Sequence, residues 1–223
     1  VYVGSDDGKL YALSETTGAV LWSAPLSGPV TASPAVDATA GEVVVSDKAG
    51  DVTAFSTGGT SPGSVLWTHT TGGAAGTPLI SGGTVYVGSA DGNEYALSEA
   101  TGTTEWSDAL GGTPSPAALT GGVLYVGTSA SALFAISPAS GSIHWQVAVP
   151  GAVTGVSVST GFVVIECANG TVAGYRSSTG ENVWLAQTGA GLSGTPAIVD
   201  NAVIVGAGDS GLYVYTPFAQ PMV

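Results

Sequence analysis

The feature that most constrains this chain is a tryptophan that returns at a nearly fixed interval. The five tryptophans lie 45, 39, 39 and 39 residues apart, at Trp22, Trp67, Trp106, Trp145 and Trp184. The opening segment VYVGSDDGKLYALS has counterparts of the same pattern that begin at Val43, Val85, Leu124, Val163 and Val203. A period of about 40 residues indicates a repeat architecture in which each unit packs against the next.

Each repeat predicts four short β-strands. A β-branched run such as Val85–Val87 is followed by a turn that often contains glycine, and then by a second apolar run such as Leu133–Ile136. A further glycine-bearing turn leads to the tryptophan strand, and a Ser/Thr-Pro strand start, such as Ser33-Pro34, precedes most units. Four strands in this length are typical of a propeller blade. We therefore predict an all-β protein, a β-propeller of four-stranded blades that forms one domain over residues 1–223. Six blades are predicted, with part of a seven- or eight-bladed propeller as the alternative.

The two ends of the chain interrupt the repeat. It starts at the second strand of a repeat, and the sixth repeat has no tryptophan strand. The first blade should therefore lack its inner strand and the last blade its outer strand. Because unpaired strand edges invite aggregation, we expect the segment TPFAQPMV (216–223) or another chain segment to pair there.

Small residues recur at fixed distances before the tryptophans. Ten residues before four of them stand Ala12, Ala96, Ala135 and Gly174, and four residues before all five stand Gly18, Gly63, Gly102, Gly141 and Gly180. A flat indole needs small residues opposite it, and its burial removes about 200 Å² from water. We predict that each tryptophan docks against the alanine and glycine of a neighbouring blade, as a structural contact rather than a ligand-stacking surface.

These residues carry a family resemblance. The pattern VYVGSxDGxLYALxxxTGxxxW is similar to the PQQ-like (pyrroloquinoline quinone) repeat of quinoprotein dehydrogenases and of the outer-membrane assembly lipoprotein of the β-barrel machinery. The spacing Ala-x5-Gly-x3-Trp resembles the tryptophan-docking motif of that superfamily. The resemblance covers essentially the whole chain and implies a propeller, but one scaffold of this kind hosts many functions.

The enzymatic branch of the superfamily fits this chain poorly. The resemblance would imply more blades than the six patterns found here, a catalytic Asp, a Ca²⁺ site and often a disulfide between adjacent cysteines. Cys167 is the only cysteine, which excludes that disulfide, and no Asp stands in a recognisable catalytic motif. We predict no catalytic residue, no cofactor and no metal site in this chain.

The charge and the hydropathy of the chain limit the kinds of partner that it can bind. Sixteen acidic residues stand against three basic ones, for a formal charge of −13, so nucleic acids and anionic membranes are poor partners. No apolar run approaches the ~18 residues of a membrane span. Because the only methionine is Met222, we expect a fragment or a processed product, and a removed signal peptide is one form of such processing.

The turns between the second and third strands of the repeats gather carboxylates. These are Asp6, Asp7, Asp47, Asp51, Asp91, Glu166 and Asp209. They predict an acidic face that attracts a basic protein segment or cations. The alternative is that short turns favour aspartate for backbone reasons.

Two glutamates depart from the repeat pattern. Glu94 stands where the other repeats have leucine or valine, and Glu166 where they have glycine or serine. A carboxylate in such a position costs free energy unless it is paired or hydrated. Both are candidate ligand or cation contacts, with a solvated strand end or a local hydrogen bond as the alternative.

The remaining reactive side chains suggest no chemistry. His69 and His144 flank the tryptophans of different repeats without a carboxylate motif, which predicts outer-strand positions rather than a metal site or a triad. Cys167 is predicted to be a small buried residue on a strand.

The sequence therefore predicts a non-catalytic domain outside the cytoplasm that mediates protein interaction or senses a ligand. Its partner would be another protein or a small ligand. One alternative is the sensor domain of a bacterial receptor-type serine/threonine kinase, because PQQ-like propellers occur fused to such kinases. The other is a fragment of a quinoprotein dehydrogenase.

Overall fold

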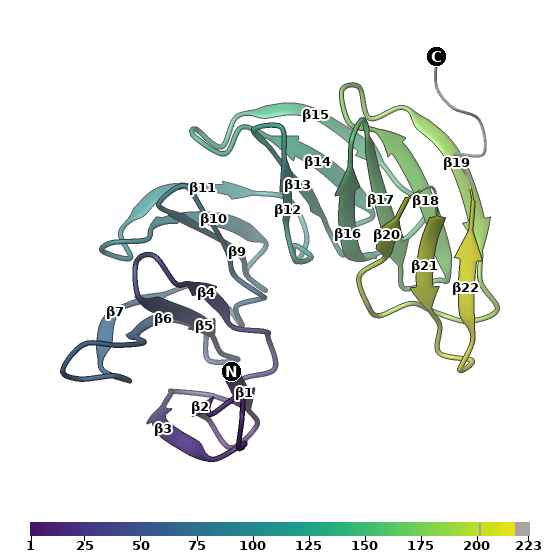
Figure 1. The fold of residues 1–223 in the computed structure, drawn as a ribbon. Helices are drawn as coiled ribbons and strands as arrows, with labels where there is room; N and C mark the ends of the chain where they lie inside the picture. The colour runs from purple at the N-terminus through teal and green to yellow at the C-terminus, as the bar shows by residue number, and fades with distance from the viewer. Residues whose placement is uncertain (201, 217–223) are drawn as a thin grey trace. The chain divides into compact units, whose positions relative to one another are not determined.

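The computed structural model describes residues 1–200 and 202–216, and these residues form six antiparallel sheets of consecutive strands (Figure 1). The chain divides into two compact units, unit 1 (Val1–Pro114) and unit 2 (Ser115–Val223), each with three sheets. No described segment forms a helix with the length and hydropathy to cross a membrane. The predicted all-β fold of propeller blades is confirmed, whereas the number of blades and the single domain stay predictions.

Unit 1 contains strands β1 to β11 in the sheet orders β1-β2-β3, β4-β5-β6-β7 and β8-β9-β10-β11. Their bounds are β1 (Tyr2–Ser5), β2 (Lys9–Leu13), β3 (Val20–Pro25), β4 (Ala35–Asp37), β5 (Glu42–Ser46), β6 (Asp51–Ser56), β7 (Val65–Thr70), β8 (Leu79–Ser81), β9 (Thr84–Gly88), β10 (Asn93–Ser98) and β11 (Thr104–Ala109). The core lies between neighbouring sheets: Leu10 of β2 packs with Val43 and Val45 of β5, and all three are fully buried.

Unit 2 repeats the arrangement in the orders β12-β13-β14-β15, β16-β17-β18-β19 and β20-β21-β22. Its strands are β12 (Ala118–Thr120), β13 (Val123–Gly127), β14 (Ala132–Ile136), β15 (Ile143–Ala148), β16 (Val153–Ser159), β17 (Phe162–Cys167), β18 (Thr171–Arg176), β19 (Asn182–Gln187), β20 (Ala197–Val199), β21 (Ala202–Gly206) and β22 (Leu212–Tyr215). Leu133 of β14 packs with Val163 and Ile165 of β17 in the same way.

The first and last sheets have three strands within the described part of the chain, where the other four sheets have four. Among residues 1–200 and 202–216, no strand precedes β1 in its sheet and no tryptophan strand follows β22, as the interrupted repeat predicts. Most of the segment 216–223, which was expected to pair at this seam, lies outside the described residues.

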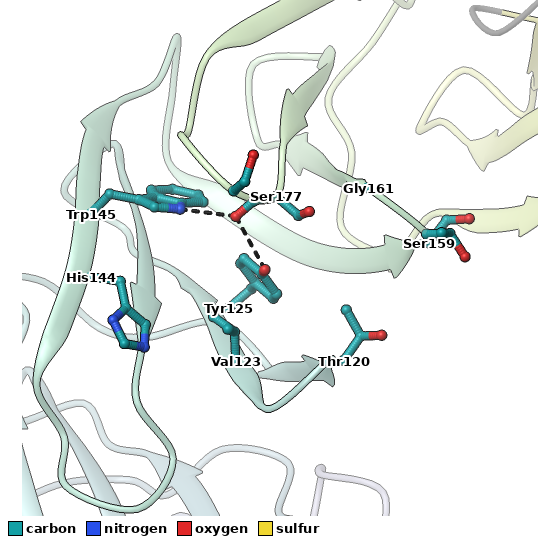
Figure 2. A pocket seen from close by; sticks show the side chains of 11 residues that line it. Thr120, Val123, Tyr125, His144, Trp145, Ser159, Gly161 and Ser177 are labelled. Carbon is teal, nitrogen blue, oxygen red and sulfur yellow. Dashed lines mark hydrogen bonds between the residues drawn. The ribbon is translucent and has the colours of Figure 1, made fainter. Parts of the chain in front are cut away.

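Each tryptophan strand carries a β-bulge beside the indole. Ala135 is opposite Trp145 and Ile136 is opposite Ile143, so His144 is the extra residue of the pair. The same shift occurs where β3, β7, β11 and β19 pair with their neighbours. A bulge bends its strand and re-aims the adjacent side chains. In β15 it brings His144 and Trp145 to one side, as Figure 2 shows.

The expected partners of the tryptophans need one correction. Ala12, Ala96 and Ala135 lie opposite Trp22, Trp106 and Trp145 within the same sheet, and Gly174 is opposite Trp184. The alanine contact with a neighbouring blade was therefore wrong. The ten-residue spacing is the distance across one hairpin, so the small residue makes room for its own cross-strand neighbour.

The glycine is the residue that the next sheet contributes. A Cβ on Gly102 would lie 2.5 Å from Cε3 of Trp67, and one on Gly63 or Gly180 would lie 2.9 or 2.7 Å from the same atom of Trp22 or Trp145. Each of these glycines belongs to the sheet that follows the tryptophan in sequence. Gly18, in the first sheet, has nothing within 4 Å of such a Cβ.

Candidate interaction sites

The acidic turns of unit 1 are built around hydrogen bonds from the hairpins themselves. The Asp91 carboxylate, in the turn between β9 and β10, accepts from the Tyr95 hydroxyl at 2.6 Å and from the Asn93 backbone N–H at 2.9 Å. It also accepts from the Gly72 N–H at 2.9 Å, in the connection that leads from β7. Burial acts to raise the pKa of Asp91, but these bonds outweigh it and hold the pKa below its usual value.

The aspartate–tyrosine contact recurs in three hairpins. Tyr11 donates to Asp7 at 2.6 Å and Tyr213 donates to Asp209 at 2.5 Å, with the same four-residue spacing. The tyrosine hydroxyl bond, aided by other local donors, lowers the pKa of both carboxylates. In the β13–β14 hairpin the two positions are Ala130 and Phe134, so carboxylate and hydroxyl are lost together. This supports a structural use of these acids.

Asp47 and Asp51 connect their hairpin to neighbouring segments. The buried Asp47 accepts backbone N–H groups from Gly28 at 3.0 Å and from Ala49 at 2.9 Å. Asp51 accepts the hydroxyls of Ser27 and Thr70, each at 2.6 Å, and these bonds lower its pKa. Gly28 and Ser27 lie in the connection between β3 and β4, so the carboxylates fasten this connection to the following sheet.

Glu94 is fully buried on β10, opposite Gly88 of β9. Both of its carboxyl oxygens are buried without a hydrogen-bond partner among the described residues. Burial raises the pKa of Glu94 to about 8, so the carboxyl is largely protonated at neutral pH. The alternative of a solvated strand end is wrong for this residue.

Glu166 lies in unit 2, on β17, with 1% of its surface exposed. Burial raises its pKa to about 7, opposed by a hydrogen bond from the Gly194 backbone. In two other sheets this position carries a glycine on which a residue leading into the next sheet, or starting it, packs: Val30 lies against Gly4 and Val153, the first residue of β16, against Gly127. A buried carboxyl beneath a connection is not part of an exposed acidic face, so that part of the prediction is wrong.

A group of carboxyls that sequence reasoning passed over lies beside Trp67. Asp37 and Glu42 are opposite each other on β4 and β5, and Asp37 is close enough to Glu99 for the two carboxyls to shift each other's pKa. Burial raises the pKa of Glu42 and of Glu99, and the neighbouring negative charges add to the shift. Among the described residues, no three acidic, histidine or cysteine side chains are placed to hold a metal ion.

The corresponding position in unit 2 is an open cavity of about 590 Å³ (Figure 2). It lies between the sheet of β12 to β15 and the sheet of β16 to β19, and its lining includes Tyr125, Trp145 and Ser177. Trp145 Nε1 and the Tyr125 hydroxyl donate to the Ser177 backbone carbonyl at 2.9 and 3.2 Å. Both rings are therefore fixed against one point of the next sheet.

The other residues considered from the sequence are placed as follows. His69 lies on β7, with its ring centroid 5.7 Å from that of Tyr95, and His144 is exposed at the cavity. Cys167 is fully buried on β17, and burial raises the pKa of its thiol to about 11. No sequence motif pointed to the cavity, since its residues come from four separate turns and strands.

The family model described as outer membrane protein assembly factor BamB matches residues 6–159 and 96–217. The chain belongs to this family of PQQ-like repeat proteins. The BamB-like chain also resembles solved structures. Over 96% of its length it matches 67% of the computationally designed Ika8 protein, with a TM-score of 0.85 and 22% identity.

BamB from Moraxella catarrhalis is a further solved structure of this fold. It matches 97% of this chain over 69% of its own length, with a TM-score of 0.78 and 18% identity. The designed Ika4 protein matches 69% of this chain over 98% of its own length, with a TM-score of 0.64 and 20% identity. A search of curated protein sequences gives no match.

Proposed function

We propose that this BamB-like chain is part of a non-catalytic propeller outside the cytoplasm that binds another protein. The family match over residues 6–159 and 96–217 carries the proposal, because the family is named for a factor that assembles other proteins. The tryptophans and the buried Asp47 are used in contacts within the protein, which supports a partner surface elsewhere. The partner then has to bind surfaces that these contacts leave exposed.

The surface that we assign to the partner is the acidic turn surface of unit 1. We define it as Asp6, Asp7, Asp51 and Asp91, in the turns before β2, β6 and β10 or at their ends. Local hydrogen bonds lower the pKa of the last three, so these carboxylates stay ionised at neutral pH. A basic protein segment would be attracted to this surface with an on-rate that falls as salt rises.

The test has to separate charge from turn structure. Asp6 is exposed and makes none of the hydrogen bonds described above, so Asp6→Asn removes a charge alone. Glu15→Gln is its matched control, an exposed carboxylate in the turn between β2 and β3. For Asp7→Asn the control is Tyr11→Phe, which removes the hydrogen bond and keeps the charge.

The measurement is the affinity of an oligolysine peptide for the whole chain, as a function of salt. Asp6→Asn and Asp7→Asn should each weaken binding a few-fold and make the salt dependence shallower, and the two controls should leave both unchanged. Equal affinity and equal salt dependence in all four variants would remove the acidic turn surface as the docking site.

A further inference from the structure

We propose that the cavity beside Trp145 in unit 2, bordered by Thr120, His144, Ser159 and Ser177, binds an uncharged sugar. The site is separate from the acidic turn surface and does not depend on the protein-binding function proposed above. Its volume of about 590 Å³ is within the range of about 300–1,000 Å³ found for small-molecule sites.

The lining offers no Asp, Glu, Lys or Arg side chain as a counter-charge to a charged ligand. None of the eleven residues around the cavity is an aspartate, glutamate, lysine or arginine. Transferring an ionised group from water into a site without a counter-charge is unfavourable.

The polar groups of the cavity are mostly hydroxyls. Thr120, Ser159, Thr160 and Ser177 contribute side-chain hydroxyls, and none of these takes part in a hydrogen bond within the described residues. A hydroxyl both donates and accepts, which suits a ligand that itself carries several hydroxyls. His144, carried to the cavity by the bulge in β15, adds a ring with a donor and an acceptor.

Two aromatic rings held by hydrogen bonds form the apolar part of the cavity. Tyr125 and Trp145 both donate to the Ser177 carbonyl, which fixes their orientation and satisfies their polar atoms (Figure 2). The partly exposed Trp145 then presents carbon surface rather than an unpaired donor to a ligand, and the buried Tyr125 lies behind it. A pyranoside combines a C–H face with a rim of hydroxyls, and it matches this division of the lining.

The same position in unit 1 shows that the fold does not require this chemistry. Trp67 Nε1 donates to the Glu99 carbonyl as Trp145 does to that of Ser177. There the positions of Thr120, Val123 and Ser177 are taken by Asp37, Glu42 and Glu99. The same arrangement of strands thus carries three carboxyls beside Trp67 and neutral hydroxyls beside Trp145. The neutral lining is therefore set by the residues of this cavity and not by the fold.

The experiment uses proton NMR of the whole chain, which contains only two histidines. His144 lies at the cavity, and His69 in unit 1 serves as the internal reference. The probes are the methyl pyranosides of glucose, galactose and mannose, with methyl glucuronoside as the charged analogue. At least one neutral probe should shift the ring signals of His144 but not those of His69, with a Kd of about 1 mM or tighter. The glucuronoside should bind at least tenfold more weakly.

Paired variants test the location. Ser159→Leu fills the cavity from the end of β16 and should abolish the His144 shift. Ser81→Leu makes the same change at the equivalent end of β8 in unit 1 and should leave it unchanged. Melting curves check that both variants fold. The proposal is overturned if no neutral probe shifts His144, if the charged analogue binds equally well, or if a folded Ser159→Leu variant binds as before.

Discussion

The indole nitrogen of Trp67 donates a 2.6 Å hydrogen bond to the backbone carbonyl of Glu99, in the turn between β10 and β11 of the next sheet. The same turn places Gly102 against the face of the indole. One side chain therefore joins two sheets through a polar contact at its edge and a packing contact at its face. The remaining exposure of Trp67 is 7%, so both contacts are shielded from water.

Trp67→Ala should destabilise the protein by about 3–5 kcal/mol, because it creates a cavity between two sheets. It also leaves the Glu99 carbonyl without its donor, which adds to the cost. Urea unfolding followed by circular dichroism measures the change. A variant that keeps the wild-type unfolding midpoint would show that the tryptophan does not hold the sheets together.

Gly102→Ala and Gly18→Ala form a matched pair that separates packing from backbone strain. Both glycines have left-handed backbones, with φ of 68° and 70°, so alanine costs each about 1–2 kcal/mol. Only Gly102 faces an indole, and crowding Trp67 should add about 1–3 kcal/mol. Equal losses of stability in the two variants would contradict the docking role of Gly102.

The hydrogen bond between Tyr95 and Asp91 predicts an energetic coupling. Asp91→Ala and Tyr95→Phe should each lower stability slightly, and the double variant should lose less than the sum of the two. A coupling of about 1 kcal/mol is expected, since the pair is accessible to solvent. The control is Phe134→Tyr, which adds a hydroxyl where Ala130 offers no acceptor and should not stabilise. Additive losses would indicate that the pair contributes nothing.

Because of Glu94, we expect the free energy of unfolding to fall as the pH rises. Its pKa is about 8 in the folded chain and near 4.5 in the unfolded chain, so between these values the folded state holds a proton that the unfolded state has released. The favourable contribution is complete below about pH 4.5 and is lost as the pH rises through 8. Glu166, with a folded pKa of about 7, acts in the same direction over a narrower window.

Glu94→Gln should flatten this pH dependence. The variant should resemble the wild type near pH 5 and exceed its stability by a few kcal/mol near pH 9, where the wild type carries a buried negative charge. Unfolding in urea at a series of pH values gives the comparison, with Glu15→Gln as the exposed control. Parallel curves for wild type and Glu94→Gln would disprove the raised pKa.

Cys167 should resist alkylation in the folded protein. The thiol is fully buried and its pKa is about 11, so at about pH 8 it is neither accessible nor ionised. Iodoacetamide should modify it at a rate that rises with urea and follows unfolding. Rapid modification of the native chain would place the thiol at an accessible surface instead.

The sheets were predictable because their signals are local. Strand runs such as Val85–Val87 and turn residues such as Gly92 specify hairpins within about 15 residues. The repeat then extends the same assignment to every sheet. The partner of Ala96 was not predictable in this way. Only the pairing register shows that Ala96 is opposite Trp106, ten residues later, in the same sheet.

The candidate sites were less accessible to sequence reasoning. The acidic turns were visible, but their hydrogen bonds to Gly28 and Gly72 depend on how connections pass over the next hairpin. The cavity gathers Thr120, Ser159 and Ser177, which share no motif and lie far apart in the chain. Glu42 could not be recognised from the sequence, because a glutamate at the start of a strand is usually hydrated, whereas this one is buried.

Three of the five tryptophans contact a glycine that lies further along the chain. Trp22 is covered by Gly63, Trp67 by Gly102 and Trp145 by Gly180, in each case by a residue further toward the C-terminus. During synthesis on the ribosome, a finished sheet of this kind therefore keeps its indole uncovered until about another 40 residues have emerged. Truncation from the two ends is likewise unequal: removing a sheet from the C-terminal side uncovers the indole of the sheet before it, whereas removing one from the N-terminal side uncovers a glycine.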